Sequence, residues 1–263
     1  MINSVLKAID IISLFSLEEP RLSLTEIGRR LSLPKSTAHN LLTTLVSRGF
    51  VEKADNDQYA LGVAIIALSQ GVRVNVELRD RAARLLRELA DASHESVYLT
   101  TLDGSQCLYI YAIESPRRLL ARTAIGERVP LHCTAVGKAI LSRMSREEIT
   151  AVAREMGLPS YTRSTLTSTA TLLKELDATL TRGYSLDREE HEEGTFCIGA
   201  AILDQKGTAI GACSVSGIDP EIIGARLPDL SAWVMHTAQE ISRRMGYVPH
   251  RPGKIVSRPA ITG

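Results

Sequence analysis

The sequence lacks signs of a disulfide framework, a zinc-ribbon site or a membrane helix, so an ordinary hydrophobic core is expected to hold the fold together. Its 263 residues include only four cysteines. None lies in a CxxC pair, so zinc-ribbon spacing is absent, and a disulfide framework is not expected at this length. No apolar run approaches the ~18 residues of a membrane helix. Because the N-terminus also lacks the basic region, apolar run and cleavage site of a signal peptide, we expect a cytoplasmic protein with reduced thiols.

Aromatic residues are also scarce, and the net charge is close to zero. Only 4% of the residues are aromatic, so the core must be built mainly from Leu, Ile, Val and Ala. The formal net charge is +1, which gives no global sign of nucleic-acid binding, so any such surface must be a local patch. With 44% hydrophobic and 23% charged residues, the composition is that of a globular protein with enough apolar content for two modest cores.

The first 62 residues begin with two predicted helices. The first covers residues 4–16, where apolar residues recur at the spacing of one helical face, namely Val5, Ile9, Ile12 and Phe15. Before the second helix, Ser23 and Glu26 fit a capping box, in which the Ser side chain covers a free N–H and the Glu reaches back. Ser32 and Leu33 then form a tight connection to the next helix.

A third predicted helix and a hairpin complete this region. The helix begins at Pro34, whose missing N–H costs nothing there, and ends at Gly49 as a left-handed cap. Strand-like runs over 49–53 and 58–61 flank the turn 54–57, whose Asp and Asn residues tolerate left-handed dihedrals. The order of helix, helix, tight turn, helix and hairpin predicts a winged helix-turn-helix over residues 1–62.

A local excess of positive charge agrees with DNA binding. Between residues 21 and 53, six basic residues stand against two acidic ones, an excess of four. Cationic side chains near phosphates release counterions, which is the main sequence-independent contribution to binding. At the start of the third helix, Asn40 could bind adenine and Lys35 a phosphate or guanine. The predicted DNA contacts are Arg29, Lys35, Ser36, Thr37, His39, Asn40 and Arg48.

The alternative is a surface helix whose polar face is only solvated, which is the usual meaning of a single helix of this kind. Here the cap, the tight turn, the second helix and the wing occur in order. Agreement across these levels favours DNA binding.

Beyond residue 62, helices alternate with strand-like runs. Strands are predicted over 97–102, 106–112, 119–123, 196–203 and 208–215. Helices are predicted over 63–79, 80–91, 134–142, 147–155, 170–182 and 227–245. Because hairpins connect most of the strands, this order predicts an α+β sandwich with an antiparallel sheet. We assign 63–79 to a linker helix, 80–246 to a second domain and 247–263 to a disordered basic tail.

Four separated motifs resemble the isocitrate lyase regulator (IclR) family. They are residues 33–51 (from LPKSTAHNLL to GFV), 129–139 (VPLHCTAVGKA), 182–191 (RGYSLDREEH) and 214–217 (SVSG). The resemblance spans residues 4–246. Two departures are Asn40, where the family often has Arg, and Ser32, where it often has Gly. The resemblance implies a regulator without enzymatic activity or cofactor, whose second domain has a GAF-like, ligand-binding fold.

The resemblance also implies an effector pocket in that domain. Carried over by motif, its contacts are Val129, Ala135, Val136, Asp187, Thr195, Cys197, Ser214 and Ser216. Ser214 and Ser216 are two apart on a strand, so both face one side. Free N–H groups at the start of the 134–142 helix favour a carboxylate, so a small organic acid is the expected effector. The lack of aromatic residues near these positions argues against a large aromatic ligand.

Each of these residues also has an ordinary structural explanation. The two serines can be satisfied strand residues, Cys197 a small buried hydrophobe and Asp187 a turn cap. The domain could instead serve only oligomerisation, in which case the core between Ala135 and Ser214 would be filled.

A third alternative is a thiol enzyme. Cys197 would be its nucleophile and Cys133 or Cys213 its resolving thiol, although no CxxC motif appears. A metal site is not predicted, because the histidines and cysteines do not fall at fixed short spacing.

The resemblance finally implies homodimers that often pair into homotetramers, with the first helix and the linker helix supplying dimer contacts. A two-fold protein implies a roughly palindromic operator in double-stranded DNA. The sequence thus predicts a ligand-responsive repressor or activator of a catabolic operon, with no membrane partner.

Overall fold

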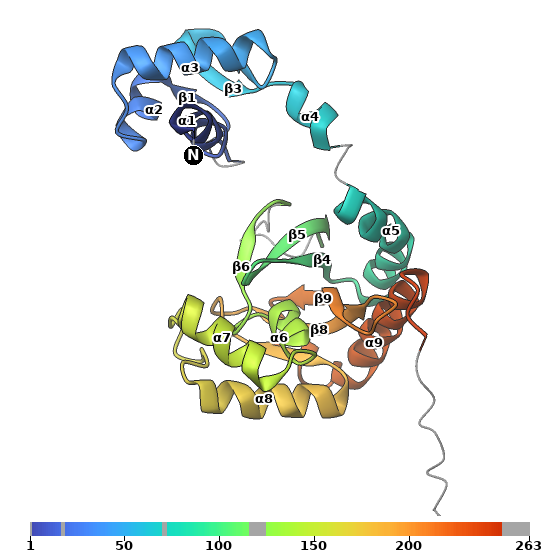
Figure 1. The fold of residues 1–263 in the computed structure, drawn as a ribbon. Coiled ribbons are helices and arrows are strands. Elements are labelled where there is room, and N and C mark those ends of the chain that lie inside the picture. Colours follow the sequence, from blue (N-terminus) through green and yellow to red (C-terminus); the bar gives the residue numbers. More distant parts are fainter. Residues whose placement is uncertain (1, 17–18, 70–72, 116–124, 249–263) are drawn as a thin grey trace, which may run out of the picture. The chain divides into compact units, whose positions relative to one another are not determined.

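The computed structural model describes residues 2–16, 19–69, 73–115 and 125–248, apart from the side chains of 55, 69 and 73–76. The chain forms two compact units, Met1–Val76 and Glu77–Gly263 (Figure 1). The predicted strand 119–123 and most of the predicted basic tail lie outside the described residues. Within the described residues, no helix combines the length and apolar character needed to cross a membrane.

The described part of the first unit combines helices with a small antiparallel sheet. In chain order it contains α1 (Asn3–Ile12), β1 (Leu22–Ser23), α2 (Leu24–Arg30), α3 (Lys35–Ser47), β2 (Val51–Lys53), the 3-10 turn η1 (Asp55–Asp57), β3 (Gln58–Leu61) and α4 (Ala64–Ser69). The strand order is β1-β3-β2. This confirms the predicted winged helix-turn-helix, with α3 as the recognition helix and β2–β3 as the wing.

α1 buries only part of the face that the sequence predicts. Ile12, and Phe15 after the end of the helix, pack against the core of the first unit, whereas Val5 and Ile9 are 52% and 54% exposed. Ile11 is buried as well, in a core with Ile27 and Leu42, where α1 packs against α3. Apolar residues occur on more than one side of this helix, so their spacing does not identify the inward side, and packing against α3 decides it.

The cap of α2 is only half of the predicted capping box. Ser23 Oγ accepts a hydrogen bond from Glu26 N at 3.2 Å. The Glu26 carboxylate bonds the guanidinium groups of Arg29 and Arg30 rather than returning to Ser23. Hydrogen bonds between two charged groups are stronger than one to a neutral backbone N–H, so the Glu26 carboxylate binds the arginines one turn along the helix.

The turns of the first unit use left-handed backbone conformations. Gly49, after α3, has φ +71°, and Asn56 and Asp57 in the wing turn have φ +60° and +57°, as their residue types predict. Ser32, in the tight turn before α3, has φ +53°. That conformation is costly for a residue with a Cβ and would suit glycine.

The second unit is a six-stranded antiparallel sheet between two layers of helices, which confirms the predicted sandwich. Its strands are β4 (Ser96–Asp103), β5 (Gln106–Ile113), β6 (Arg128–Pro130), β7 (Ser185–Arg188), β8 (Phe196–Leu203) and β9 (Ala209–Gly217), in the order β6-β5-β4-β9-β8-β7. Its helices are α5 (Arg73–Ser93), α6 (Ala135–Leu141), α7 (Arg146–Met156), α8 (Thr169–Arg182), the 3-10 turn η2 (Pro220–Ile222) and α9 (Leu227–Arg244).

The sheet has an aliphatic core on each face. α5 and α9 cover one core, which includes Leu86, Ile198 and Val234. α6, α7 and α8 cover the other, which includes Ile140 and Leu172 (Figure 1). The space between α6 and the sheet is where the candidate site forms.

Short strands and one helix boundary differ from the predictions. β1, β6 and β7 are two to four residues long, too short to show an alternating pattern in the sequence. α5 runs unbroken through the boundary predicted between residues 79 and 80. Leu78, Ala82 and Leu86 are buried at helical spacing on both sides of that boundary. One apolar stripe therefore continues along α5, although the charged residues after position 79 suggested that a new helix begins there.

Candidate functional site

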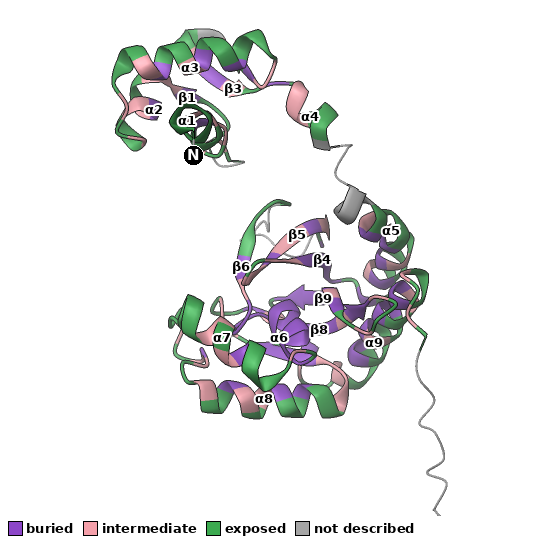
Figure 2. Ribbon diagram, viewed as in Figure 1, coloured by how far each residue is buried: buried purple, intermediate pink, exposed green. Residues whose placement is uncertain are grey.

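α3 presents a polar face of the kind that enters a DNA groove. Its inner side is buried through Ala38, Leu42 and Leu45. Figure 2 shows the exposed side along the helix. Of the predicted contacts on α3, Lys35, Ser36, His39 and Asn40 are exposed and Thr37 is half-buried. Arg48, which follows the end of the helix, is also exposed. These side chains leave donors and acceptors free for base edges and phosphates.

Ion pairs reduce the positive charge beside this face. Arg29 bonds Glu26 at 2.7 Å, and Arg30 bonds both Glu19 and Glu26. Hydrogen bonds from Arg29 and then Arg30 lower the pKa of Glu26 to about 2. Lys35 and Arg48 have no ion pair within the part of the chain that the structure describes. Glu19, outside the stretch counted in the sequence, therefore offsets part of the excess of four charges.

All eight predicted effector contacts line one cavity in the second unit. The cavity has a volume of about 120 Å³ and lies between the sheet and the start of α6. The predicted residues that it brings together are Val129, Ala135, Val136, Asp187, Thr195, Cys197, Ser214 and Ser216. A cavity lined by both Ala135 and Ser214 contradicts the filled core expected of a domain that serves only oligomerisation.

The sheet places a row of polar side chains on the floor of this cavity. Directly opposite residues of antiparallel strands point to the same face. Asp187 is paired with Cys197, and Cys197 with Ser216, so three strands contribute to one row. Cys197 Sγ donates to Ser216 Oγ at 3.0 Å. In the next row Ser214 lies opposite Tyr98.

Two glycines let α6 pack closely against the segment after β6 and against the sheet. A Cβ on Gly137 would lie 2.4 Å from the carbonyl oxygen of Leu131, and one on Gly199 would lie 2.8 Å from the backbone of Ala135. Thr134 caps the helix, because its Oγ1 accepts from Gly137 N at 3.1 Å. The whole of α6 is buried (Figure 2). Ala135 and Val136, the first two residues of α6, line the cavity, and their N–H groups have no partner inside the helix.

A buried charge cluster adjoins the cavity. Lys138 of α6 is fully buried and forms an ion pair with Glu190, whose second oxygen, Oε2, has no hydrogen-bond partner. Asp187 Oδ1 accepts from Glu190 N at 2.8 Å. Burial raises the pKa of Asp187 to about 7 and also raises the pKa of Glu190. One cation therefore balances two buried carboxyl groups.

The sequence did not predict six further lining residues: Tyr98, Tyr109, Glu127, Thr134, His191 and Glu192. The rings of Tyr98 and Tyr109 lie edge to face with centroids 5.4 Å apart, so the expected lack of aromatic residues is wrong. β4 is buried on both faces for most of its length, so alternation gave no inward side. His191 and Glu192 lie in a loop whose sequence indicates only polarity. Burial lowers the pKa of His191, which leaves its ring neutral at pH 7.

The thiols do not form a reactive pair in this site. Cys213 lies three positions before Ser216 on β9, so it faces the opposite side from Cys197. Burial raises the pKa of Cys213 and of Cys107 to about 12 and also raises the pKa of Cys133. These three thiols lack the thiolate that exchange chemistry needs. Among the described residues, no group of three or more His, Cys, Asp or Glu is placed to hold a metal ion.

A helix-turn-helix with an exposed polar face on its second helix, joined to a domain with a polar cavity, defines a DNA-binding transcriptional regulator with an effector-binding domain. Residues 4–55 match the IclR helix-turn-helix domain, and residues 70–243 match the C-terminal domain of the bacterial transcriptional regulator IclR. The chain belongs to the IclR family of bacterial transcriptional regulators.

Relatives match over nearly the whole chain. The HTH-type transcriptional regulator XynR of Escherichia coli is 31% identical over 248 residues, which cover 94% of this chain and 98% of that protein. The acetate operon repressor of Salmonella typhimurium is 34% identical over 85% of this chain and 83% of its own. The Thermotoga maritima IclR structure is 28% identical, with a TM-score of 0.79 over 93% of this chain and 99% of that chain. Membership of a family of regulators rejects the thiol-enzyme alternative.

Proposed function

We propose that this regulator contacts a roughly palindromic operator through α3 and responds to a small carboxylic acid bound in the cavity between α6 and the sheet. The observation that carries the proposal is that the predicted effector contacts meet in one place. Eight positions from distant parts of the sequence line one polar cavity, in a chain that also exposes the polar face of α3.

On the DNA side, Asn40 and Lys35 occupy exposed positions at the N-terminal end of α3, where they would meet base edges and phosphates. Ser36, Thr37 and His39 would add further hydrogen bonds along the same face. Arg48 and Arg29 would contact phosphates, with Arg29 the weaker because Glu26 holds its guanidinium.

On the effector side, the carboxylate would lie at the free N–H groups that begin α6. The described part of the lining contains carboxyl groups at Asp187, Glu127 and Glu192 and no Lys or Arg. Such a lining attracts hydrogen-bond donors, so the remainder of the ligand would carry hydroxyl groups. A small hydroxy acid satisfies both ends of the cavity, with Ser214 and Ser216 as further partners.

We also propose assembly through α1, since four large apolar residues on it or directly before it are exposed: Ile2, Val5, Leu6 and Ile9. Val63 and Leu68, around α4, are exposed as well, in the segment expected to link the domains of a homodimer or homotetramer. A regulator of this kind works at the chromosome, in the cytoplasm. The relative named acetate operon repressor supports control of a catabolic operon.

The test is to select binding sites from random duplex DNA and then titrate hydroxy acids and plain carboxylic acids while measuring operator affinity. We expect two-fold symmetric sites and at least one hydroxy acid that changes the affinity. Ser216→Ala should lose the response and retain DNA binding, whereas Thr181→Ala, which removes an exposed hydroxyl on α8, should keep both. Acids that bind in the cavity and leave operator affinity unchanged would contradict the coupling.

A further inference from the structure

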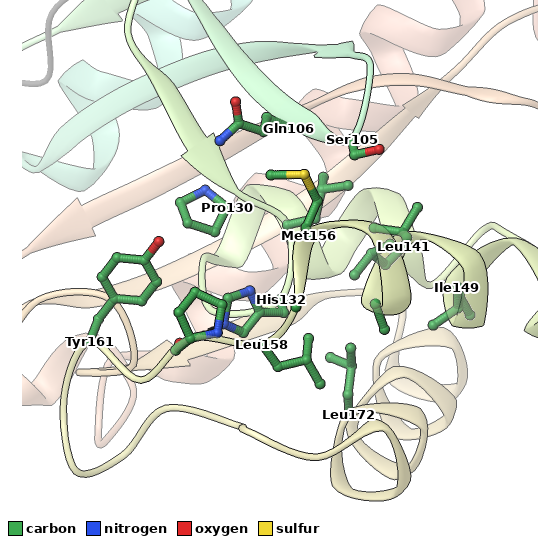
Figure 3. A pocket seen from close by; sticks show the side chains of 15 residues that line it. Ser105, Gln106, Pro130, His132, Leu141, Ile149, Met156, Leu158, Tyr161 and Leu172 are labelled. Atoms are coloured by element: carbon green, nitrogen blue, oxygen red, sulfur yellow. Dashed lines mark hydrogen bonds between the residues drawn. The ribbon is translucent and has the colours of Figure 1, made fainter.

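A second cavity lies beside the effector cavity, under α7 and between α6 and the start of α8. Its volume is about 60 Å³. Most of its lining is aliphatic, including Leu141, Ile149, Val152, Met156, Leu158 and Leu172. Figure 3 shows Leu141 and Ile149 at one end and Tyr161 at the other, with Met156 above the space. None of the residues that line the effector cavity belongs to this lining.

The strand β6 and the segment after it form the wall between the two cavities. Val129 of β6 lines the effector cavity, and its neighbour Pro130 lines the second one, because successive strand residues point to opposite faces. Further along, His132 lines the second cavity and Thr134 the effector cavity. A change in either space therefore acts on the same short stretch of backbone.

Polar groups lie at the edges of the second cavity. His132 Nε2 lies 3.1 Å from the carbonyl oxygen of Pro159, and this nitrogen must donate, because a carbonyl only accepts. Burial lowers the pKa of His132, so the ring is neutral and Nδ1 keeps a lone pair. At the edge near α7, Ser105 Oγ donates to Glu155 Oε2 at 2.8 Å and ties the β4–β5 turn to that helix.

The size and chemistry of this space fit a compact apolar molecule with one hydroxyl group. One water needs about 10–15 Å³ of such volume, so about 60 Å³ holds several non-hydrogen atoms. A small apolar molecule would gain dispersion contacts with the aliphatic side chains that line this space, which water does not supply. A ligand hydroxyl would find an acceptor at His132 or a partner at Tyr161.

We propose that this cavity is a second small-molecule site that binds a compact apolar alcohol and modulates the effector cavity. The connection is the loop between α7 and α8. Its Leu158 and Tyr161 line the second cavity. The centroid of the Tyr161 ring lies 5.0 Å from that of the His191 ring, and His191 lines the effector cavity.

Hydrogen bonds join the same loop to the segment that closes the effector cavity. Thr162 Oγ1 donates to the carbonyl oxygen of Glu189, and Thr165 Oγ1 to that of Glu190, each at 2.6 Å. An alcohol that fills the second cavity would hold this loop in place and order residues 189–195 behind it. By linkage, the alcohol and the effector would then raise each other's affinity by the same factor, a step that rests on the proposed effector function.

The experiment uses the full chain and two probes with the same number of non-hydrogen atoms, the apolar alcohol cyclopentanol and the polar glycerol. Binding is followed by calorimetry, and ordering of residues 189–195 by amide hydrogen exchange. Ala153→Leu fills the cavity from α7, and Ala151→Leu makes the same change on the exposed side of that helix. If Ala153→Leu unfolds more easily than the wild type, Met156→Phe fills the cavity from its partly exposed edge.

In the wild type and in Ala151→Leu we expect saturable cyclopentanol binding, and slower amide exchange over 189–195 when cyclopentanol is bound. In the cavity-filling variant, the affinity for cyclopentanol and the slowing of exchange should both fall at least tenfold. Glycerol should not bind. Absent binding, equal binding of glycerol, or binding that survives the filled cavity would overturn the site. Binding without a change in exchange would overturn the modulation. Neither readout uses operator DNA or an acid, so a failed acid response with intact cyclopentanol binding would reject the proposed effector instead.

Discussion

At the scale of single residues, Asp187 shows how the effector cavity is balanced. Its carboxyl is buried on the cavity floor, with Glu190 N as hydrogen-bond donor and the Lys138–Glu190 ion pair close by. Desolvation outweighs these partners and raises the pKa of Asp187 to about 7. Near neutral pH the cavity can therefore take up a proton at this site, which would ease the entry of an anionic ligand.

The first prediction concerns Asp187→Asn, which keeps an acceptor oxygen but cannot ionise. Because the folded-state pKa of about 7 lies above the usual 3.8, the wild type is fully stabilised by this group only below the usual value, and it loses that stability as pH rises to about 7. The free energy of unfolding of the variant, relative to wild type, should rise by on the order of 2–3 kcal/mol between about pH 5 and about pH 8. Urea unfolding at both pH values measures it. The exposed control Asp177→Asn should show no such trend, and parallel profiles for Asp187→Asn would contradict the assignment.

The second prediction concerns Ser32, whose φ of +53° is costly for a residue with a Cβ. Ser32→Gly should raise the free energy of unfolding of the first unit by about 1 kcal/mol. Ser36→Gly, in the first turn of α3, should lower it by about 0.5 kcal/mol, because glycine loses more conformational freedom in a helix. Thermal unfolding of the full chain compares the two. Equal shifts in the same direction would show that the turn is not strained.

At the scale of elements, helix packing determines which side chains are available. α3 buries Ala38 and Leu42 and so exposes Lys35 and Asn40. α2 pairs its own arginines with Glu26, so the two helices of the motif contribute unequally to the positive surface. We therefore expect the DNA-binding charge to be concentrated at α3 and the residues around it.

The third prediction tests that division of charge. Lys35→Ala should weaken binding to duplex DNA and reduce the slope of log affinity against log salt by about 1, since one phosphate contact is lost. Glu26→Gln should do the opposite, because it releases Arg29 and Arg30 from their carboxylate partner. Fluorescence anisotropy across a salt series measures both, with Glu147→Gln on α7 as the control. An unchanged slope in Lys35→Ala would place the DNA elsewhere.

At the scale of the whole molecule, regulation requires that two compact units influence each other. The first unit exposes an apolar face on α1 that its own core does not use, and the second encloses a cavity whose walls are shared with a neighbouring one. A two-fold assembly through α1 would present two α3 helices to one operator. The effector would then act by changing the balance between arrangements of the two units.

The fourth prediction addresses this assembly. Val5→Asp or Ile9→Asp places a charge on the exposed apolar face of α1, where each side chain is about half exposed. We expect at least a tenfold weaker dimer in sedimentation experiments, because burial of one aliphatic side chain is worth about 1.5–3 kcal/mol. Leu180→Asp, a comparably exposed position on α8, should leave the dimer intact. A dimer that tolerates both α1 changes would move the interface to another surface.

The sequence by itself determined the family and the order of most of the longer elements in both units. Local rules were sufficient wherever a signal lies within a few residues, as in the Ser23 cap, the left-handed Gly49 and the hairpin of β8 and β9. The eight effector positions came from motifs and met in one cavity, because matching motifs carry the same fold.

Only the tertiary structure decided the features that depend on residues far apart in the chain. It selected Ile11 rather than Val5 for the core of the first unit, and it paired Arg30 with Glu19. It also brought Tyr98 and His191 into the effector cavity and left a second cavity under α7. The physical reason is that hydrophobic spacing records which residues share a side of an element, whereas the neighbour that covers that side, and the space left between them, are set by packing.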